Sequence, residues 1–278
     1  MRIAVLLVRH PPARRSPIMP EVVRLLAEWN CEVTVLEPDE RPLDTTAMRV
    51  EHDLYVLKSG SELALSLAGA LHAQGARIVN PFPASLACRD KVMTTALLQA
   101  AGLPVPETRV TTRLADVAEL LTDGPVVCKP ARGSQGRGVR VVRDADELAG
   151  LARAALPGEP WLAQRYHQAD GVDRKLYSIA GQAFGVERVW PAHSYEEKVG
   201  RPFTVDETLS DLVGRCGSAI GGMSLFGVDV VESGGAPYVV DMSSFPGFKG
   251  VPDAALRLAD HLYWTARSSA PLSPAVPV

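Results

Sequence analysis

The sequence lacks the features that define several common protein classes. None of its four cysteines forms a CxxC pair, which argues against a zinc site and fits small core residues in a reducing compartment. No apolar stretch reaches membrane-spanning length, and Ile3–Val8 is too short for the core of a signal peptide. The net charge of −3 gives no bulk attraction to nucleic acid or to a membrane surface. We therefore expect a cytoplasmic protein without nucleic-acid or membrane partners.

Two common nucleotide-binding motifs are also missing. No GxGxxG follows the first predicted strand, so a dinucleotide site there is not supported. No GK[ST] occurs after a glycine-rich loop, which excludes a Walker A motif. Internal repeats are absent as well. A nucleotide site in this chain must therefore be built in another way.

The first 80 residues alternate between predicted strands and helices. With 278 residues, the chain is long enough for about two domains, or for one domain with several lobes. Alternation of this kind predicts an open α/β sheet. The predicted strands are Ile3–Val8, Cys31–Leu36, Asp53–Leu57 and Arg77–Asn80, and the predicted helices are Met19–Trp29 and Leu63–Gln74.

The remainder of the chain mixes hairpins with single helices. The proline-rich segment Asn80–Ala84 predicts a lobe boundary. Predicted helices are Ser85–Ala101, Leu114–Leu121, Asp146–Ala155 with Asp144 or Asp146 as its cap, one within Val205–Met223, and Asp253–Tyr263. Predicted strands are Pro125–Lys129, Val139–Val142, Trp161–Tyr166, and a hairpin of Arg174–Ala180 and Gln182–Val189; the tail from Ala266 is expected to be disordered.

The segment Leu225–Val251 contains two apolar strand-like runs joined by a glycine-rich turn. Each run carries one aspartate, Asp229 or Asp241, where a hydrophobic strand would not need one. Paired antiparallel strands would bring both carboxylates to the same end of a sheet, where hard oxygen ligands suit Mg²⁺ with nucleotide phosphates. The alternative is a hairpin with two surface aspartates.

The loop from Lys129 to Val139 indicates an anion site. Lys129 lies at a strand end, and Gly133, Gly136 and Gly138 follow. Small residues allow backbone N–H groups to close on a phosphate, and a lysine supplies a positive charge. The alternative is a flexible hairpin turn.

Other polar residues fit a nucleotide site less specifically. Lys91 is placed near a helix start, where it would ordinarily be a solvated residue. The segment Gln164–His167 leaves a strand, which suits an adenine pocket read by backbone amides. Asp173 follows in a loop, where a carboxylate would hold ribose hydroxyls or simply form a turn.

Together these segments resemble the ATP-grasp superfamily. The order Asp90-Lys91, Gly102–Thr108, Val127–Val139, Gln164, Gly171–Asp173, Gly227–Asp229 and Asp241…Gly247 carries the resemblance, over roughly Asn80 to Tyr263. It is similar above all to the ribosomal-protein-S6-glutamate-ligase-like branch. No single motif is very specific, but seven motifs in the expected order are strong evidence for the resemblance.

The resemblance implies the ATP-grasp fold, of the α/β and α+β classes, with an N-terminal Rossmann-like open α/β lobe (1–84). Central (85–164) and C-terminal (165–265) α+β lobes would grip ATP, followed by a disordered tail (266–278). Phosphate contacts would come from Lys91 and Lys129. The implied cofactor-binding set is completed by Gly133, Ser134, Gln135, Gly136 and Gly138 as a flap, by Gln164, Arg165, Tyr166 and His167 near adenine, and by Asp173 at the ribose.

The resemblance also implies a metal site and catalytic residues. Asp229, Asp241 and Ser243 would coordinate one or two Mg²⁺ ions, although the family usually has asparagine where this chain has Ser243. Arg188 and Lys129 would be catalytic, with Arg188 stabilising the transferred phosphoryl group.

Three functions remain open at this stage. The first is a ligase that joins a small-molecule or peptide carboxylate to an amine through an acylphosphate. The second is a kinase, because Leu57-Lys58, Asp173–Gly181 and Phe245–Val251 resemble inositol-trisphosphate 5/6-kinases. The third, a nucleotide-binding module without catalysis, is the least favoured. Candidate substrate residues are Arg9, His10, Lys58 and Lys175, with Arg14 and Arg15 in the same basic cluster as Arg9, and the resemblance is compatible with a homodimer.

Overall fold

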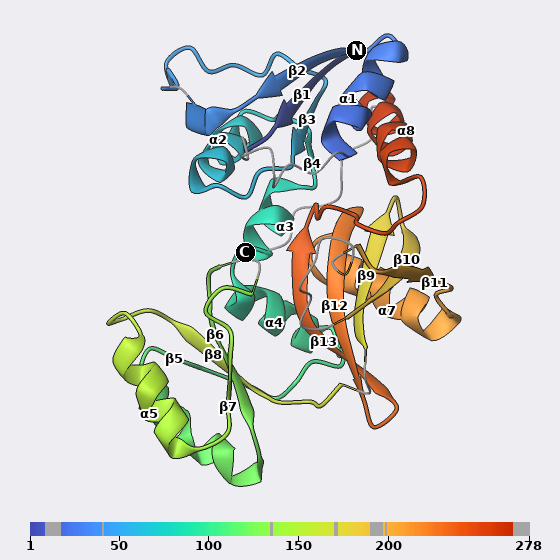
Figure 1. Cartoon of the computed structure of the whole chain (residues 1–278). Coiled ribbons are helices and arrows are strands. Elements are labelled where there is room, and N and C mark those ends of the chain that lie inside the picture. The colour runs from blue at the N-terminus through green and yellow to red at the C-terminus, as the bar shows by residue number, and fades with distance from the viewer. Residues whose placement is uncertain are drawn as a thin grey trace.

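A computed structural model describes residues 1–8, 18–40, 42–133, 136–169, 172–189, 197 and 199–268 of the chain. Within these residues the strands form three separate sheets, one inside each of the three predicted lobes (Figure 1). The predicted mixture of parallel and antiparallel sheets is confirmed. Among the described helices, none combines the length and the apolar character that crossing a membrane demands.

The N-terminal sheet is parallel, with the order β2-β1-β3-β4. The inner strands β1 and β3 are apolar because both faces are covered, with α2 on one side and α1 with α8 on the other (Figure 1). Ser61 caps α2 by accepting a hydrogen bond from the Ala64 amide. The elements are β1 (Arg2–Leu6), α1 (Ile18–Glu28), β2 (Glu32–Leu36), the short 3₁₀ helix η2 (Pro38–Glu40), β3 (Leu54–Leu57), α2 (Glu62–Ala73) and β4 (Ile78–Val79).

The predicted helix Ser85–Ala101 is wrong in one respect, because it is two helices. These are α3 (Phe82–Ala87) and α4 (Lys91–Ala100). Asp90 is extended between them, and its side chain accepts hydrogen bonds from the Val92 and Met93 amides of α4. Prolines at the start of α3 suit a helix entry, so the predicted lobe boundary contains a helix rather than a loop.

The central sheet is antiparallel, with the order β5-β8-β6-β7. Leu114–Leu121 was expected to be an ordinary helix, but the segment is a 3₁₀ helix. Its buried residues Leu114, Val117 and Leu120 are three apart, which is the period of that helix. Asp144 is confirmed as the cap of the next helix. The elements are β5 (Thr108–Thr111), η3 (Leu114–Asp123), β6 (Val126–Pro130), β7 (Arg140–Val142), α5 (Ala145–Ala154) and β8 (Trp161–Arg165).

The C-terminal sheet is antiparallel, with the order β11-β10-β9-β12-β13. Helix α7 packs on it, and α8 lies beside α1 while also contacting β9, between the C-terminal and N-terminal sheets (Figure 1). The predicted tail begins too early, since Ala266 and Arg267 belong to α8; residues 269–278 lie outside the described part. The elements are β9 (Asp173–Ile179), β10 (Gln182–Arg188), β11 (Arg201–Phe203), α7 (Glu207–Ala219), β12 (Leu225–Ser233), β13 (Ala236–Ser244) and α8 (Ala254–Arg267).

Asn80, which is fully buried, joins the N-terminal sheet to the C-terminal sheet. Its amide nitrogen donates to the Leu225 carbonyl at 2.6 Å and to the Ser244 hydroxyl at 3.0 Å. Its oxygen accepts the Ser224 and Leu225 amides. Through these four hydrogen bonds Asn80 fixes how β12 and β13 meet the end of β4.

Candidate active site

The β12–β13 hairpin places the two predicted aspartates directly opposite each other. Asp229 pairs in register with Asp241, and Gly227 pairs with Ser243. The strands shift register just after Asp229. The expectation that paired strands bring both carboxylates to one place is therefore confirmed.

Asp229 is held by two cations from the neighbouring strands. Lys175 Nζ on β9 donates to one carboxylate oxygen at 2.7 Å, and Arg188 Nη2 on β10 donates to the other at 3.1 Å. Burial alone would raise the pKa of Asp229, but both cations oppose it and the pKa is lowered. Asp229 is therefore a persistent negative charge, and Lys175, predicted as a substrate residue, is paired with it.

Arg188 also joins Asp173 to this network. Its Nη2 atom donates to the Asp173 carboxylate at 2.6 Å, across the β9–β10 pair. Burial raises the pKa of Asp173, and the charge of Arg188 offsets only part of that effect. The predicted ribose residue and the predicted catalytic arginine thus share one ion-pair cluster with Asp229.

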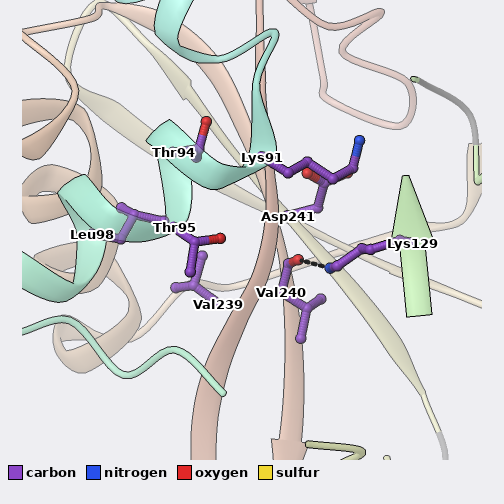
Figure 2. A pocket seen from close by; sticks show the side chains of 8 residues that line it. All are labelled: Lys91, Thr94, Thr95, Leu98, Lys129, Val239, Val240 and Asp241. Carbon is purple, nitrogen blue, oxygen red and sulfur yellow. Dashed lines mark hydrogen bonds between the residues drawn. The ribbon is translucent and has the colours of Figure 1, made fainter. Parts of the chain in front are cut away.

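Asp241 faces a second group of positive charges. Figure 2 shows Lys91 from the start of α4 and Lys129 from β6 on either side of its carboxylate. Lys129 Nζ donates to the Val240 carbonyl at 2.7 Å, which links the central lobe to β13. Burial lowers the pKa of Lys129, while the charges of Asp241 and Asp229 raise it.

The space between these groups is nearly filled. The cavity is about 10 Å³, room for about one water molecule. Its walls come from α4, β6 and β13, and its residues are Lys91, Thr94, Thr95, Leu98, Lys129, Val239, Val240 and Asp241. A molecule larger than water does not fit in this cavity as it stands.

The glycine-rich flap is attached to Lys91. Lys91 Nζ donates to the Gly133 carbonyl at 2.9 Å. Gly136 and Gly138 have φ of 69° and 78°, a region that disfavours other residues. A Cβ on Gly138 would lie 2.8 Å from Pro130 Cγ, so only glycine fits there. The predicted flap residues Ser134 and Gln135 lie outside the described residues.

The predicted adenine segment is partly engaged within the protein. The Arg165 and Tyr166 amides donate to the Glu107 and Pro125 carbonyls, and the Arg165 guanidinium bonds η3. Gln164 Nε2 donates to the Thr108 hydroxyl at 2.9 Å. These two amides are therefore occupied in this arrangement of the lobes.

His167 is the residue of this segment that contacts the β12–β13 hairpin. Its ring stacks on Tyr238 of β13, with centroids 3.7 Å apart and planes inclined by 23°. Burial lowers the pKa of His167, and the nearby charge of Arg165 lowers it further. Since stacking takes place on ring faces, an aromatic base is the kind of group that this pair of rings would accept.

Lys58 lies at the other side of the junction, directly after β3. Its Nζ donates to the Phe245 carbonyl at 2.9 Å, just beyond β13. Burial lowers the pKa of Lys58 to about 8. The remaining residues of the predicted basic cluster, Arg9, His10, Arg14 and Arg15, lie outside the described part of the chain, as does Gly171.

Sequence reasoning missed several residues that complete this region. They are Asn80, Cys88, Arg89 and Tyr238. For Asn80 the signal was its place between an apolar strand and a proline; for Arg89 it was a charge beside Asp90-Lys91. Tyr238 sits in an ordinary strand pattern, and nothing in the sequence distinguishes it.

The donor set on the hairpin fits Mg²⁺. Two carboxylates and a hydroxyl are hard oxygen donors, and Mg²⁺ is usually held by one or two carboxylates together with substrate phosphates. Across the described residues no cluster of three or more His, Cys, Asp or Glu side chains suits a metal. Asp229, Asp241 and Ser243 are therefore the groups that could hold it, with phosphate oxygens completing the shell.

Comparison with known proteins places the chain in its class. A solved structure from Sphaerobacter thermophilus, an ATP-grasp protein with a RimK domain, superposes with a TM-score of 0.77 at 20% identity, covering 96% of this chain and 100% of that one. The fold is therefore the ATP-grasp fold, as expected. A model of the RimK-like ATP-grasp domain matches residues 88–262. The chain belongs to the RimK-like ATP-grasp family.

Curated relatives align over most of the chain at 26% and 28% identity. A probable alpha-L-glutamate ligase of Stenotrophomonas maltophilia is 28% identical over 204 residues, covering 68% of this chain and 70% of that protein. The glutamate–LysW ligase ArgX of Sulfurisphaera tokodaii is 26% identical over 244 residues, covering 82% of this chain and 86% of that protein. Both relatives are named as ligases.

Proposed function

We propose that the protein is a Mg·ATP-dependent ligase that joins a carboxylate to an amine through an acylphosphate, releasing ADP and phosphate. The observation that carries this proposal is the meeting of Asp229 and Asp241 on paired strands with Lys91 and Lys129 beside Asp241. Two acids bind a metal, and two lysines from another lobe neutralise phosphate charge. A hairpin with two surface aspartates would need neither lysine.

The residues divide the work as follows. Asp229, Asp241 and Ser243 would hold the metal. Asp229 would give up the hydrogen bond from Lys175 or the one from Arg188, and the freed oxygen would bind the metal instead. A Mg²⁺ ion held there would supply positive charge to offset the negative charge of the phosphate oxygens. Lys91 and Lys129 hold the phosphates beneath the Gly133–Gly138 flap. Arg188 supplies positive charge to the loose transition state of phosphoryl transfer.

The lobes must separate for ATP to bind, because the cavity is about 10 Å³. Two contacts of β13 open in that motion. They are the hydrogen bond from Lys129 to the Val240 carbonyl and the stack of His167 on Tyr238. Both are contacts that ATP can replace, since Lys129 would turn to a phosphate and the rings to adenine. Closure of the flap then excludes water from the acylphosphate.

The ligase is favoured over the kinase by the relatives, which are named as glutamate and LysW ligases. The proposed substrates are a small-molecule or peptide carboxylate and an amine. A homodimer, one or two Mg²⁺ ions, a cytoplasmic location and the lobe limits 1–84, 85–164 and 165–265 belong to the same proposal.

Product analysis tests the reaction type. The purified protein is incubated with Mg·ATP and a panel of carboxylates and amines, and ADP, free phosphate and new amide are quantified. A ligase yields ADP, phosphate and amide in equal amounts. A phosphorylated product with no free phosphate would establish the kinase instead.

The variant Asp241→Asn tests the metal site. Loss of one charge at the metal is expected to lower turnover of Mg·ATP by at least about a hundredfold, or about 2.7 kcal/mol. Asp211→Asn, on the exposed surface of α7, is the control and should retain full activity. Full activity in Asp241→Asn would remove Asp241 from the metal site.

A further inference from the structure

Both oxygens of the Asp229 carboxylate are already hydrogen-bonded to cations of the chain. One oxygen accepts from Lys175 Nζ at 2.7 Å, and the other accepts from Arg188 Nη2 at 3.1 Å. Only 25% of the Asp229 side chain and 10% of the Lys175 side chain are exposed, so water and salt screen this pair weakly. A Mg²⁺ ion on either oxygen would lie against a positive charge, and one of the two cations must therefore move away.

Arg188 is fixed by a second carboxylate, whereas Lys175 is not. The same Nη2 atom of Arg188 donates to Asp173 at 2.6 Å, and the two residues are directly paired between β9 and β10. Within the described residues the Lys175 ammonium donates a hydrogen bond to Asp229 and to no other group. Its charge is carried on a flexible four-carbon stem, whereas the arginine fork is planar and rigid. Lys175 is therefore the cation that leaves with the smaller loss of contacts.

The strand register leaves space beside the Lys175 stem. Lys175 is directly opposite Asp229 in the β9–β12 pair. Its Cε atom leans over Gly227, where a Cβ would lie 3.0 Å away. Gly227 is two residues from Asp229 on the same face of β12, and it has no side chain to block the stem. The ammonium can therefore swing away from Asp229 while β9 stays paired with β12.

A cation at Asp229 is needed whenever the metal is absent. Asp229 lies directly opposite Asp241, and like charges at paired positions of antiparallel strands repel each other. Arg188 compensates Asp229 only in part, because it also serves Asp173. Without Lys175 and without a metal, Asp229 would be a largely buried charge that shares a single guanidinium with another acid.

We propose that Lys175 takes the place of the metal at Asp229 in the metal-free chain and gives it up when Mg²⁺ arrives with the nucleotide. The ammonium keeps Asp229 compensated, and it makes binding of free Mg²⁺ unfavourable because the metal must first displace it. A nucleotide adds phosphate oxygens as ligands, which favours the exchange. Lys175 is a positioning residue in this role, since it acts through Asp229. The inference rests on the proposed function, because it concerns how the same metal site is filled.

Metal binding without nucleotide tests the exchange. The full-length protein and its Lys175→Met variant are titrated with Mn²⁺, which suits the same oxygen ligands as Mg²⁺, and free Mn²⁺ is followed by its EPR signal. Lys175→Met is expected to bind Mn²⁺ at least tenfold more tightly than the unchanged protein, and the double variant Lys175→Met/Asp229→Asn should lose that gain. Lys175→Arg, which keeps the positive charge, should bind Mn²⁺ as weakly as the unchanged protein. A lysine with a merely structural role would give the opposite result, because its loss would disturb the site and weaken binding.

Thermal unfolding gives a second readout that does not depend on activity. In EDTA, Lys175→Met should melt at a lower temperature than the unchanged protein, because Asp229 has lost a partner. Added Mg²⁺ should restore much of that loss in the variant and should leave the unchanged protein as it was. Lys175→Gln is a second neutral variant, which can still donate a hydrogen bond to Asp229 and so disturbs the fold less.

The variant Arg257→Met is the control for the change in charge. Arg257 is exposed on α8, and its guanidinium donates to the Gln182 side chain rather than to an acid. This variant should bind Mn²⁺ as the unchanged protein does. A similar gain in Mn²⁺ affinity in Arg257→Met and in Lys175→Met would assign the effect to net charge and would overturn the exchange.

A nucleotide titration separates this inference from the function on which it rests. A non-hydrolysable ATP analogue should bind the unchanged protein at least tenfold more tightly with Mg²⁺ than with EDTA. If it does, but neither Lys175→Met nor Lys175→Gln binds Mn²⁺ more tightly than the unchanged protein, the exchange is overturned and the proposed metal site stands. If Mg²⁺ does not strengthen binding of the analogue, the proposed metal site is overturned and the exchange with it.

Discussion

Single residues in this molecule carry charge that the fold does not neutralise, and Lys58 shows the consequence for stability. Its pKa of about 8 in the folded chain lies below the usual 10.5. Between these two values the unfolded chain binds a proton that the folded chain does not, so stability rises with pH. Below pH 8 both states are charged and the full penalty of burial applies.

We therefore expect the free energy of unfolding to rise by about 1–2 kcal/mol between pH 8 and pH 10 on account of Lys58. The figure is kept below the full shift because Lys58 retains some contact with solvent. Urea denaturation at both pH values gives the free energy of unfolding of the unchanged protein and of Lys58→Met. The contribution of Lys58 is the difference between the two proteins in the slope of that free energy against pH. Equal slopes would mean that Lys58 titrates normally.

Residues that carry local signals could be predicted from the sequence, and residues defined by distant contacts could not. Asp229 and Asp241 stand out because each interrupts an apolar strand. The contacts of Asn80 could not be predicted, since its partner Leu225 is 145 positions away in the chain. The position of Arg89 becomes clear only in the structure, where its guanidinium packs beside Gly60.

At the scale of elements, the flap depends on backbone shape more than on side chains. Gly138 combines a φ of 78° with close contact to Pro130, the last residue of β6. A methyl group there would push the flap away from the strand that carries Lys129. The flap would then close less completely over the phosphates.

The variant Gly138→Ala is expected to raise the KM for ATP about tenfold, because about 1.4 kcal/mol of binding is lost to strain and misplacement. Gly158→Ala is a matched control, since Gly158 has the same φ of 78° with no atom near its Cβ position. Steady-state kinetics with varied ATP compares the two variants. An equal effect of both would assign the loss to backbone strain alone.

Elements with strong periodicity were predicted well, and short or polar ones were not. The β9–β10 and β12–β13 hairpins follow from apolar runs and glycine turns. Strands β5 and β11 were missed because each is short, polar and at a sheet edge, so pairing rather than pattern creates it. The division of α3 from α4 depends on the extended conformation of Asp90, which a helical pattern conceals.

At the scale of the whole molecule, the hydrophobic cores divide unevenly among the lobes. One core joins residues of β1 and α1 to residues of β9, β12 and α8, so it spans the N-terminal and C-terminal sheets. The central sheet has a core of its own, which includes Leu148 and Val126. The molecule is therefore one large unit with the central lobe attached to it.

We expect Leu148→Ala to destabilise the central lobe by about 2–4 kcal/mol while leaving the other two sheets unchanged. Hydrogen exchange followed by mass spectrometry would show faster exchange confined to residues 108–165. Val22→Ala, in the shared core, is the contrasting variant and should speed exchange in both other sheets together. Uniform exchange in Leu148→Ala would mean that the three lobes unfold as one.

The class of the whole molecule was predictable because the motifs occur in a fixed order. The arrangement of the lobes was not, since it depends on contacts such as those of Asn80 and Lys129 between distant segments. The near closure of the cavity also follows from that arrangement. No local pattern in the sequence encodes it.

The central sheet begins and ends at neighbouring strands, because Thr108 of β5 pairs with Gln164 of β8. The chain thus enters and leaves this lobe at one place, as in an inserted module. Residues 108–165 are therefore the natural unit for a graft from a relative, with two adjacent junctions to rebuild. Such a chimaera would exchange β6 with Lys129 and the loop that follows it while preserving the β12–β13 hairpin with Asp229 and Asp241.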